Sequence, residues 1–166
     1  MKISIETLDN SNSEDITNMI LPIQQLEFGV SITLADQPDL LSIEDFYINS
    51  GGNFWGAMVE GKLCGTIALL RFNGKAGAIR KMFVKKEFRG KQYGLAAMLL
   101  EELIDYCSDH GISDLYLGTV EILQAAIRFY EKNGFIKVDK KDLPQDFPVM
   151  ASDDVFFHLR MQKNLR

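Results

Sequence analysis

The stretch MFVKKEFRGKQYGLAAMLLEELIDYC, residues 82–107, joins an apolar strand-like run to a helix-like run through a turn with two glycines. A helix is expected from about Tyr93 to His110, because apolar residues recur there at helical spacing and acidic residues take the other side. A strand that ends in a Gly-rich turn before a helix directs backbone N–H groups and the positive end of the helix dipole at one point. Such a turn favours binding of a phosphate or pyrophosphate.

Two glycines in this turn, Gly90 and Gly94, have no Cβ and allow an anion to come close to the backbone. Arg89 and Lys91 add positive charge. Gln92 stands where a third glycine would be unsurprising, and it fits if its φ is negative. The turn lacks both the GxxxxGK[ST] and the GxGxxG pattern, so it is neither a Walker motif nor a dinucleotide fingerprint. An ordinary strand-to-helix connector is the alternative at this point.

Three strand-like runs precede this turn: FWGAMVE, KLCGTIALLRF and GAIRKMFV. Short Gly-containing connections, EGK and NGKAG, separate them and predict antiparallel hairpins. Nearer the N-terminus, KISIETL alternates like a strand. A helix then opens at Ser11, with Glu14 at capping-box spacing, and should kink or split at Pro22. A second, short helix is expected around Asp39–Asn49.

After the long helix come a strand, DLYLGTV, a helix, ILQAAIRFYEKNG, and two closing strands, FIKV and DVFFHLRM. The step from MFV through the helix to DLYLGTV has the length of a crossover, so these two strands should be parallel neighbours. The predicted fold class is α+β (mixed α/β). It has a central mixed, mostly antiparallel sheet of about seven strands flanked by helices, in one domain over residues 1–166.

The composition is typical of a globular protein, with 46% hydrophobic and 25% charged residues among 166. A formal net charge of −5 argues against non-specific nucleic-acid binding. No apolar run approaches the roughly 20 residues that span a bilayer, and the N-terminus has no signal-like core, so we expect no membrane association and a cytoplasmic protein. Two cysteines and two histidines, far apart in sequence, indicate neither a disulfide framework nor a metal site.

Two segments together resemble the GNAT superfamily of N-acetyltransferases. Residues 82–107 are similar to its acyl-CoA-binding strand, [R/Q]-x-x-G-x-[G/A] loop and helix, and AAIRFYEKNGF, residues 125–135, is similar to its A-x-x-F-Y-x-x-x-G-F signature. The two occur in the family's order and at a family-like separation. The chain departs from the family at Gln92, which replaces the usual first glycine of the loop, and at Leu123, where many members carry asparagine.

The resemblance implies that the cofactor is acetyl-CoA. The main chain near the strand end would pair with the pantetheine arm, an N–H near Val84 would polarise the thioester carbonyl, and loop N–H groups would hold the pyrophosphate. The implied cofactor-binding residues are Met82, Phe83, Val84, Arg89, Gly90, Lys91, Gln92, Tyr93, Gly94, Leu95, Ala125 and Phe129. Tyr130 would be the general acid that protonates the departing thiolate, since a phenol is still protonated at pH 7. Its alternative role is that of a core aromatic.

The implied reaction is acetyl transfer to a primary amine of a small molecule or peptide. The strand GAIRKMFV holds no carboxylate to deprotonate that amine, so Glu27 and then Glu121 are the candidate bases, against a surface charge or a water relay. Acceptor contacts are expected from Leu26–Asp36 and Leu143–Ser152. Phe28, Trp55 and Phe147 could form an aromatic wall, and Arg80 would suit an acidic acceptor; core packing and a salt bridge are the alternatives.

Three other expectations stay open from the sequence. A non-catalytic acyl-CoA-binding sensor would share both segments, and a nucleotide- or phosphate-binding protein would share only the loop. A homodimer is expected by analogy with relatives.

Overall fold

The computed structural model describes residues 1–161. Their seven strands follow the order β1-β2-β3-β4-β5-β7-β6, a mixed sheet with helices against it, as the sequence predicts. The chain divides into two compact units. The first holds Met1–Leu70 and Arg80–Tyr106; the second holds Arg71–Ile79 and residues 107–161.

The elements have these bounds. The strands are β1 (Ile3–Thr7), β2 (Asn53–Val59), β3 (Lys62–Arg71), β4 (Ala76–Val84), β5 (Asp114–Thr119), β6 (Ile136–Val138) and β7 (Val155–Arg160). The α-helices are α1 (Ser13–Pro22), α2 (Leu95–Asp109) and α3 (Gln124–Lys132). Short 3-10 or π-helical turns occupy Asn10–Asn12, Ile23–Glu27, Pro38–Leu41, Glu44–Ile48, Lys86–Phe88 and Lys140–Asp142.

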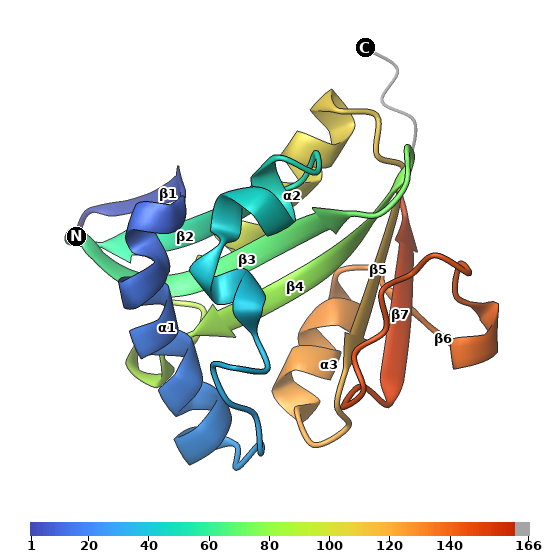
Figure 1. Ribbon diagram of the computed structural model, residues 1–166. Helices are drawn as coiled ribbons and strands as arrows, with labels where there is room; N and C mark the ends of the chain where they lie inside the picture. The colour runs from blue at the N-terminus through green and yellow to red at the C-terminus, as the bar shows by residue number, and fades with distance from the viewer. Residues whose placement is uncertain (162–166) are drawn as a thin grey trace. The chain divides into compact units, whose positions relative to one another are not determined.

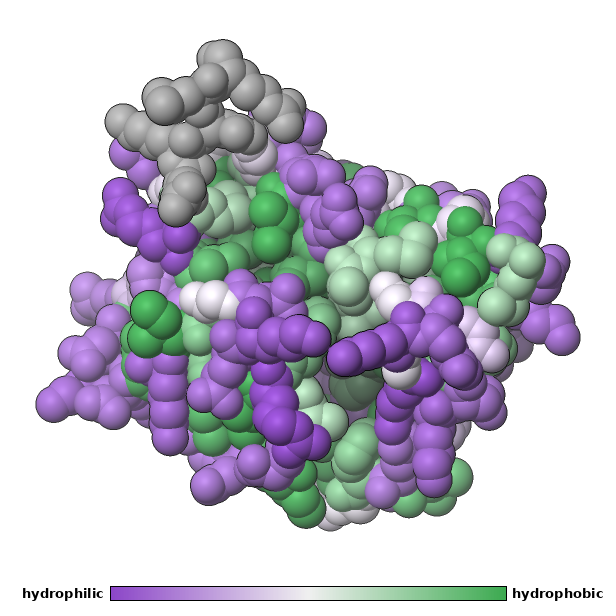
Figure 2. All heavy atoms as spheres, turned by 180° about the vertical axis from the view of Figure 1, so that it is seen from behind, coloured by the Kyte–Doolittle hydropathy of each residue, from purple (hydrophilic) through white to green (hydrophobic). Residues whose placement is uncertain are grey.

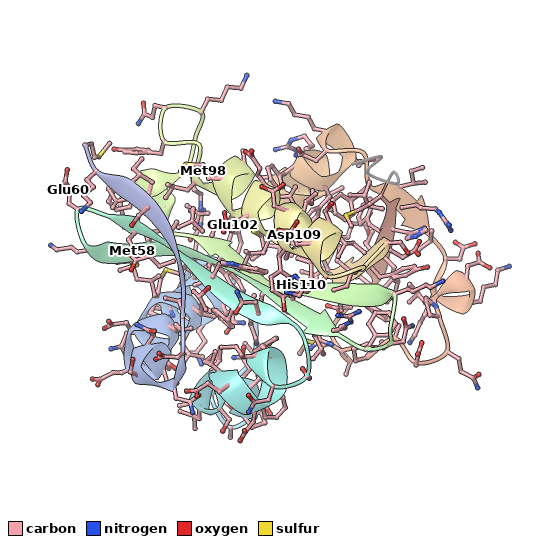
Figure 3. The ribbon with its side chains drawn as sticks, turned by 90° about the horizontal axis from the view of Figure 1, so that it is seen from above. Met58, Glu60, Met98, Glu102, Asp109 and His110 are labelled. Atoms are coloured by element: carbon pink, nitrogen blue, oxygen red, sulfur yellow. The ribbon has the colours of Figure 1, made fainter. Side chains whose placement is uncertain are left out.

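In the first unit, β2 pairs antiparallel with both β1 and β3. Val59 and Lys62 face each other across a two-residue turn, Glu60–Gly61, whose φ angles are +50° and +76°. Two positive φ angles make a type I′ turn, the connection whose twist suits a hairpin. The hairpin expected at EGK is therefore confirmed, and Figure 3 shows Glu60 at its tip.

Helices cover both faces of the first unit's strands. In Figures 1 and 3, α1 lies on one face and α2 on the other. The inward row of α2 includes Leu95, Leu99 and Leu103, each at most 1% exposed. A Cβ built on Gly65 of β3 would lie 3.2 Å from Leu99 Cδ1, so this glycine lets the helix pack close. Figure 2 shows the α2 face, where hydrophilic side chains are interspersed with hydrophobic ones.

The helical segments before β2 differ from expectation. The capping box expected at Ser11 and Glu14 is not formed: Asn12 stands at the N-cap of α1, and its side chain makes no cap hydrogen bond there. A capping box of Asp9 and Asn12 closes the preceding 3-10 turn instead, where Ser11 N donates to Asp9 Oδ1 at 2.9 Å. The split expected at Pro22 is confirmed: α1 ends there and a π-helical turn follows, with Phe28 N donating to Ile23 O at 3.1 Å. The helix expected over Asp39–Asn49 is two short turns, interrupted at Ser42 by a non-helical ψ of 60°.

In the second unit, β4 and β5 run parallel, from Ala76 opposite Asp114 to Ala78 opposite Tyr116, which confirms the crossover. β7 pairs antiparallel with β5 and with β6. Helix α3 ends at Lys132, and Gly134, just after its C-cap, has φ +91°, the left-handed conformation that commonly follows the end of a helix.

Candidate functional site

The last residues of β4 are fixed within the first unit. Thr66 Oγ1 donates to Lys81 O at 2.7 Å, and Lys85 N donates to Cys64 O at 2.9 Å. Met82 and Phe83 are half-buried and Val84 is buried. They lie beyond the three residues of β4 that pair with β5. The three residues expected to meet the pantetheine arm thus form a well-held strand end.

The loop between β4 and α2 has a defined set of backbone donors. Tyr93 N and Gly94 N both donate to Gly90 O, at 3.3 and 3.2 Å, so these two amides serve the loop itself. The remaining loop amides and the first turn of α2 have no hydrogen-bond acceptor among residues 1–161. These N–H groups belong to Gly90, Lys91, Gln92, Leu95, Ala96 and Ala97. Free amides beside a helix N-terminus are an arrangement that can bind an anion, and the six residues are called the anion cradle below.

The backbone angles of this loop bear out the reading of its glycines. Gly90 has φ +110° and Gly94 has φ +64°. Among the described residues other than glycine, only Glu60 and Lys81 have positive φ, so Gln92 does not. Gln92 therefore has the negative φ that its place in the loop requires. A Cβ on Gly90 would touch nothing within 4 Å, so the glycine is required by conformation and not by space.

Arg89 turns its side chain toward the protein. Its Nε donates to Val84 O at 2.8 Å, and its two terminal nitrogens donate to the two Glu27 carboxylate oxygens, Nη2 to Oε1 at 2.8 Å. The guanidinium lies 5.6 Å from the centre of the Phe28 ring. Hydrogen bonding by Arg89 lowers the pKa of Glu27 below its usual value. Arg89, Glu27 and Phe28, expected in three roles, are thus brought together, and the side chain of Lys91 stays exposed.

The expected aromatic wall is not an exposed surface. Trp55 is 3% exposed and packs edge-on to Tyr106, with ring centres 5.4 Å apart. Phe147 is 6% exposed and packs edge-on to Phe72, at 5.7 Å. Core packing, the alternative weighed for Trp55, is what this burial shows, because an indole and a phenyl ring stabilise most where they are removed from water.

Two charged residues expected near the acceptor lie on different elements. Arg80 is half-buried on β4. Glu121 is exposed in the turn before α3, where its N–H donates to Asp154 Oδ1 at 2.9 Å. Across residues 1–161, no group of three or more His, Cys, Asp or Glu side chains is placed to hold a metal ion.

Tyr130 lies inside the second unit, on α3, and is 5% exposed. Its ring packs against Phe129, Phe135 and Phe157, with centres 5.6–6.2 Å apart. Burial, and secondarily the charge of Asp153, raises the pKa of Tyr130 well above its ordinary value near 10. The hydroxyl is therefore protonated at neutral pH, as a general acid must be. On the same helix, Ala125 is exposed and Phe129 half-buried.

A buried polar network in the first unit was not foreseen from the sequence. Lys81 Nζ donates to Gln37 Oε1 at 2.5 Å and lies 3.6 Å from Asp39 Oδ2, which accepts from Tyr47 OH at 2.6 Å. Gln24 and Gln37 exchange two amide hydrogen bonds, at 3.0 and 2.9 Å. A lysine within an apolar strand run was the one available signal; its φ of +52° has no signature in the sequence.

Residues 17–135 match the acetyltransferase (GNAT) family. The chain belongs to this family. A solved acetyltransferase of the GNAT family from Staphylococcus aureus Mu50 is 37% identical with a TM-score of 0.93, covering 97% of this chain and 100% of that one. An acetyltransferase from Streptococcus agalactiae is 27% identical with a TM-score of 0.91, covering 96% and 98%.

Among curated relatives, N-acetylaspartate synthetase of Xenopus tropicalis is 30% identical over 134 residues, which are 78% of this chain and 48% of that protein. The Danio rerio protein of the same name is 32% identical over 106 residues, 63% of this chain and 37% of that one. The chain thus spans half or less of the length of these relatives. No helix in residues 1–161 is both long and apolar enough to cross a membrane.

Proposed function

We propose that this GNAT family member transfers an acetyl group from acetyl-CoA to a primary amine of a small molecule or peptide. The observation that carries the proposal is the cradle of unpaired amides at Gly90–Gln92 and at the start of α2, placed directly after the held end of β4. A pyrophosphate is an anion of the size and charge that such a cradle stabilises. Neighbours of the same fold support it at the level of architecture: a Thermoplasma acidophilum acetyltransferase was solved with coenzyme A, at 18% identity and a TM-score of 0.74.

Acetyl-CoA, when bound, supplies the activated acetyl group. The main chain of Met82–Val84 aligns the pantetheine arm, and an N–H near Val84 stabilises the negative charge that develops on the thioester oxygen. The loop amides and the exposed Lys91 ammonium hold the pyrophosphate. With the cofactor bound, Tyr130 would donate its phenolic proton to the thiolate sulfur that leaves as the carbon–sulfur bond breaks. The raised pKa of Tyr130 supports this role, because the group keeps its proton until the thiolate forms.

The amine must lose a proton before it attacks the carbonyl carbon. Glu27 is a weak candidate for the base, because Arg89 occupies both of its oxygens and lowers its pKa. Glu121, which is exposed, or an ordered water would serve instead. The names of the N-acetylaspartate synthetase relatives favour an acceptor that carries a carboxylate beside its amine. Arg80, half-buried on β4, is the proposed partner of that carboxylate.

A homodimer is a separate proposal, made by analogy with relatives.

Calorimetry with coenzyme A and with ATP tests the cofactor, and a panel of amines, with release of free thiol from acetyl-CoA as readout, tests the reaction. We expect binding of coenzyme A and turnover with at least one carboxylate-bearing amine. Binding of ATP without coenzyme A would overturn the family-based assignment of the loop.

One observation favours a second candidate, a non-catalytic acyl-CoA sensor. Leu123 stands at the N-cap of α3 and makes no side-chain cap there, where many members carry asparagine. Tight coenzyme A binding with no turnover on any amine would support that alternative.

A further inference from the structure

Residues 25–36, called here the acceptor-side loop, are closed at their base by two buried glutamines. Gln24, 9% exposed, and Gln37, 1% exposed, join the two ends of the loop through their paired amides. Gln24 O also accepts from Val30 N at 2.8 Å. A buried amide pair with both hydrogen bonds made is a directional link, and breaking it would leave unsatisfied polar groups. The loop is therefore held at its base while its outer residues are exposed.

The first connection from this loop to β4 passes through that base. Lys81 Nζ donates to Gln37 and stands near Asp39, so a buried ammonium on β4 fixes the end of the loop. Lys81 directly precedes Met82, the first residue expected to meet the cofactor. Its φ of +52° is left-handed, a conformation that is costly for a residue other than glycine and persists only where the surrounding structure holds it.

The second connection joins the loop to the anion cradle. Arg89 directly precedes Gly90, the first residue of the cradle, and Glu27 and Phe28 belong to the acceptor-side loop. The guanidinium donates to both Glu27 oxygens and to Val84 O, and it lies over the Phe28 ring. A planar fork of this kind fixes direction as well as distance, which a lysine could not reproduce. Arg89 therefore links the start of the segment Gly90–Gln92 directly to Glu27 and Phe28.

We propose that Glu27 is a positioning residue which, through Arg89, transmits occupancy of the anion cradle to the acceptor-side loop, so that coenzyme A and the acceptor bind cooperatively. The inference rests on the proposed function, because it requires coenzyme A to bind at residues 89–97. In this proposal Glu27 orients the acceptor-side loop and does not contact the reacting atoms. By thermodynamic linkage, coenzyme A should raise the affinity for the acceptor by the same factor as the acceptor raises the affinity for coenzyme A.

Hydrogen exchange of backbone amides tests the proposal without knowledge of the acceptor. In the wild-type protein, saturating coenzyme A should slow exchange both at residues 89–97 and in the acceptor-side loop. The slowing in the loop should be at least about fivefold, the lower end of typical coupling between sites. In Glu27→Gln, which keeps the size of the side chain and removes its charge, residues 89–97 should still be protected and the loop should lose its response.

Two further variants separate loss of the Glu27–Arg89 contact from the general effect of removing one negative charge. Glu14→Gln removes one negative charge from an exposed position of α1 that has no ion pair in the described chain, and it should behave as wild type. Arg89→Lys keeps the charge but not the fork, so it should reproduce the loss of loop response. Once an acceptor is found, Glu27→Gln should raise its KM by at least about fivefold and leave the dissociation constant of coenzyme A within about twofold.

The outcomes are distinguishable. If coenzyme A fails to protect residues 89–97 in the wild type, the proposed function fails and this inference with it. If residues 89–97 are protected and the acceptor-side loop either does not respond or responds equally in Glu27→Gln, the coupling alone is overturned and the proposed function stands.

Discussion

At the scale of single residues, Tyr130 combines burial with a hydroxyl that stays protonated. Tyr130→Phe removes one oxygen and keeps the ring that packs on Phe135 and Phe157. We expect turnover to fall by one to several orders of magnitude, in the range of general acid catalysis, with affinity for coenzyme A nearly unchanged. Because the pKa of Tyr130 is raised, its ionisation should produce no alkaline loss of wild-type turnover below about pH 10. Steady-state assays and calorimetry check both statements; wild-type turnover in the variant would remove Tyr130 from the mechanism.

Gly90, Gly94 and Gln92 form a matched set within one loop. Replacement of Gly90 or Gly94 by valine forces a β-branched residue toward positive φ, which strains the backbone by about 1–3 kcal/mol. Relaxation of that strain would misdirect the cradle amides, so affinity for coenzyme A should fall by roughly tenfold or more. Gln92→Gly should change affinity little, because Gln92 already has an ordinary φ. Calorimetric titration of the three variants checks the contrast, and equal losses in all three would contradict it.

The residues of the β4–α2 loop could be predicted, because glycines and the start of a helical pattern are visible in the sequence. The direction in which a side chain points is not visible there. Arg89 was expected to face the cofactor, yet its donors are directed at Glu27 and Val84. Only the fold brings Glu27, 62 residues away in sequence, within reach. The network around Lys81 escaped prediction for the same reason, since its partners come from three separate segments.

At the scale of elements, helical periodicity predicted the long helix. The short Gly-containing connection predicted the hairpin at Glu60–Gly61, and the length of the crossover predicted the parallel step from β4 to β5. The irregular region before β2 was less predictable. Its 3-10 and π-helical turns use nearly the same residue types as α-helices, and hydrogen-bond register, which has no sequence code, separates them. Asp9 caps the 3-10 turn before α1, and Ser11, expected to open the helix, lies within that turn. Both residue types are good caps, so the path of the chain decides which of them is used.

The pair that links the π-helical turn to the β4–α2 loop should respond to acid in a predictable direction. The folded-state pKa of Glu27 is lowered, so the ion pair is present above the ordinary carboxyl pKa of about 4.3 and is lost as pH falls through the lower folded value. Protection of the acceptor-side loop by coenzyme A should therefore persist at pH 5 and fade only below about pH 4. Hydrogen exchange at matched intrinsic rates checks this. Loss of the loop response between pH 7 and pH 5 would point to another group.

At the scale of the whole molecule, the order of strands and helices followed from sequence, because alternation and helical periodicity each report which face is buried. The division into two compact units did not; besides separating Leu70 from Arg71 at the end of β3, its boundary falls inside β4 and inside α2. Both elements are continuous in sequence pattern across that boundary, so no break in composition marks it.

Both thiols of the chain are buried in the fold: Cys64 is 1% exposed and Cys107 is not exposed. Burial raises the pKa of Cys107 to about 12, and burial also raises that of Cys64. The native protein should therefore react slowly with an aromatic disulfide reagent, and two thiols should titrate once denaturant unfolds it. Absorbance of the released thiolate measures both phases. A fast native reaction of either thiol would contradict the burial and would add background to any assay of free coenzyme A.

Lys81 carries two requirements that no other single residue meets. Its left-handed backbone would suit glycine or asparagine, while its ammonium holds Gln37 and Asp39 in the interior. A change to glycine would relieve the backbone and leave the partly buried Asp39 carboxylate without this cation, an arrangement that is costly. Homologous chains that lose the lysine should therefore also have lost the acid at position 39, so that positions 39 and 81 covary.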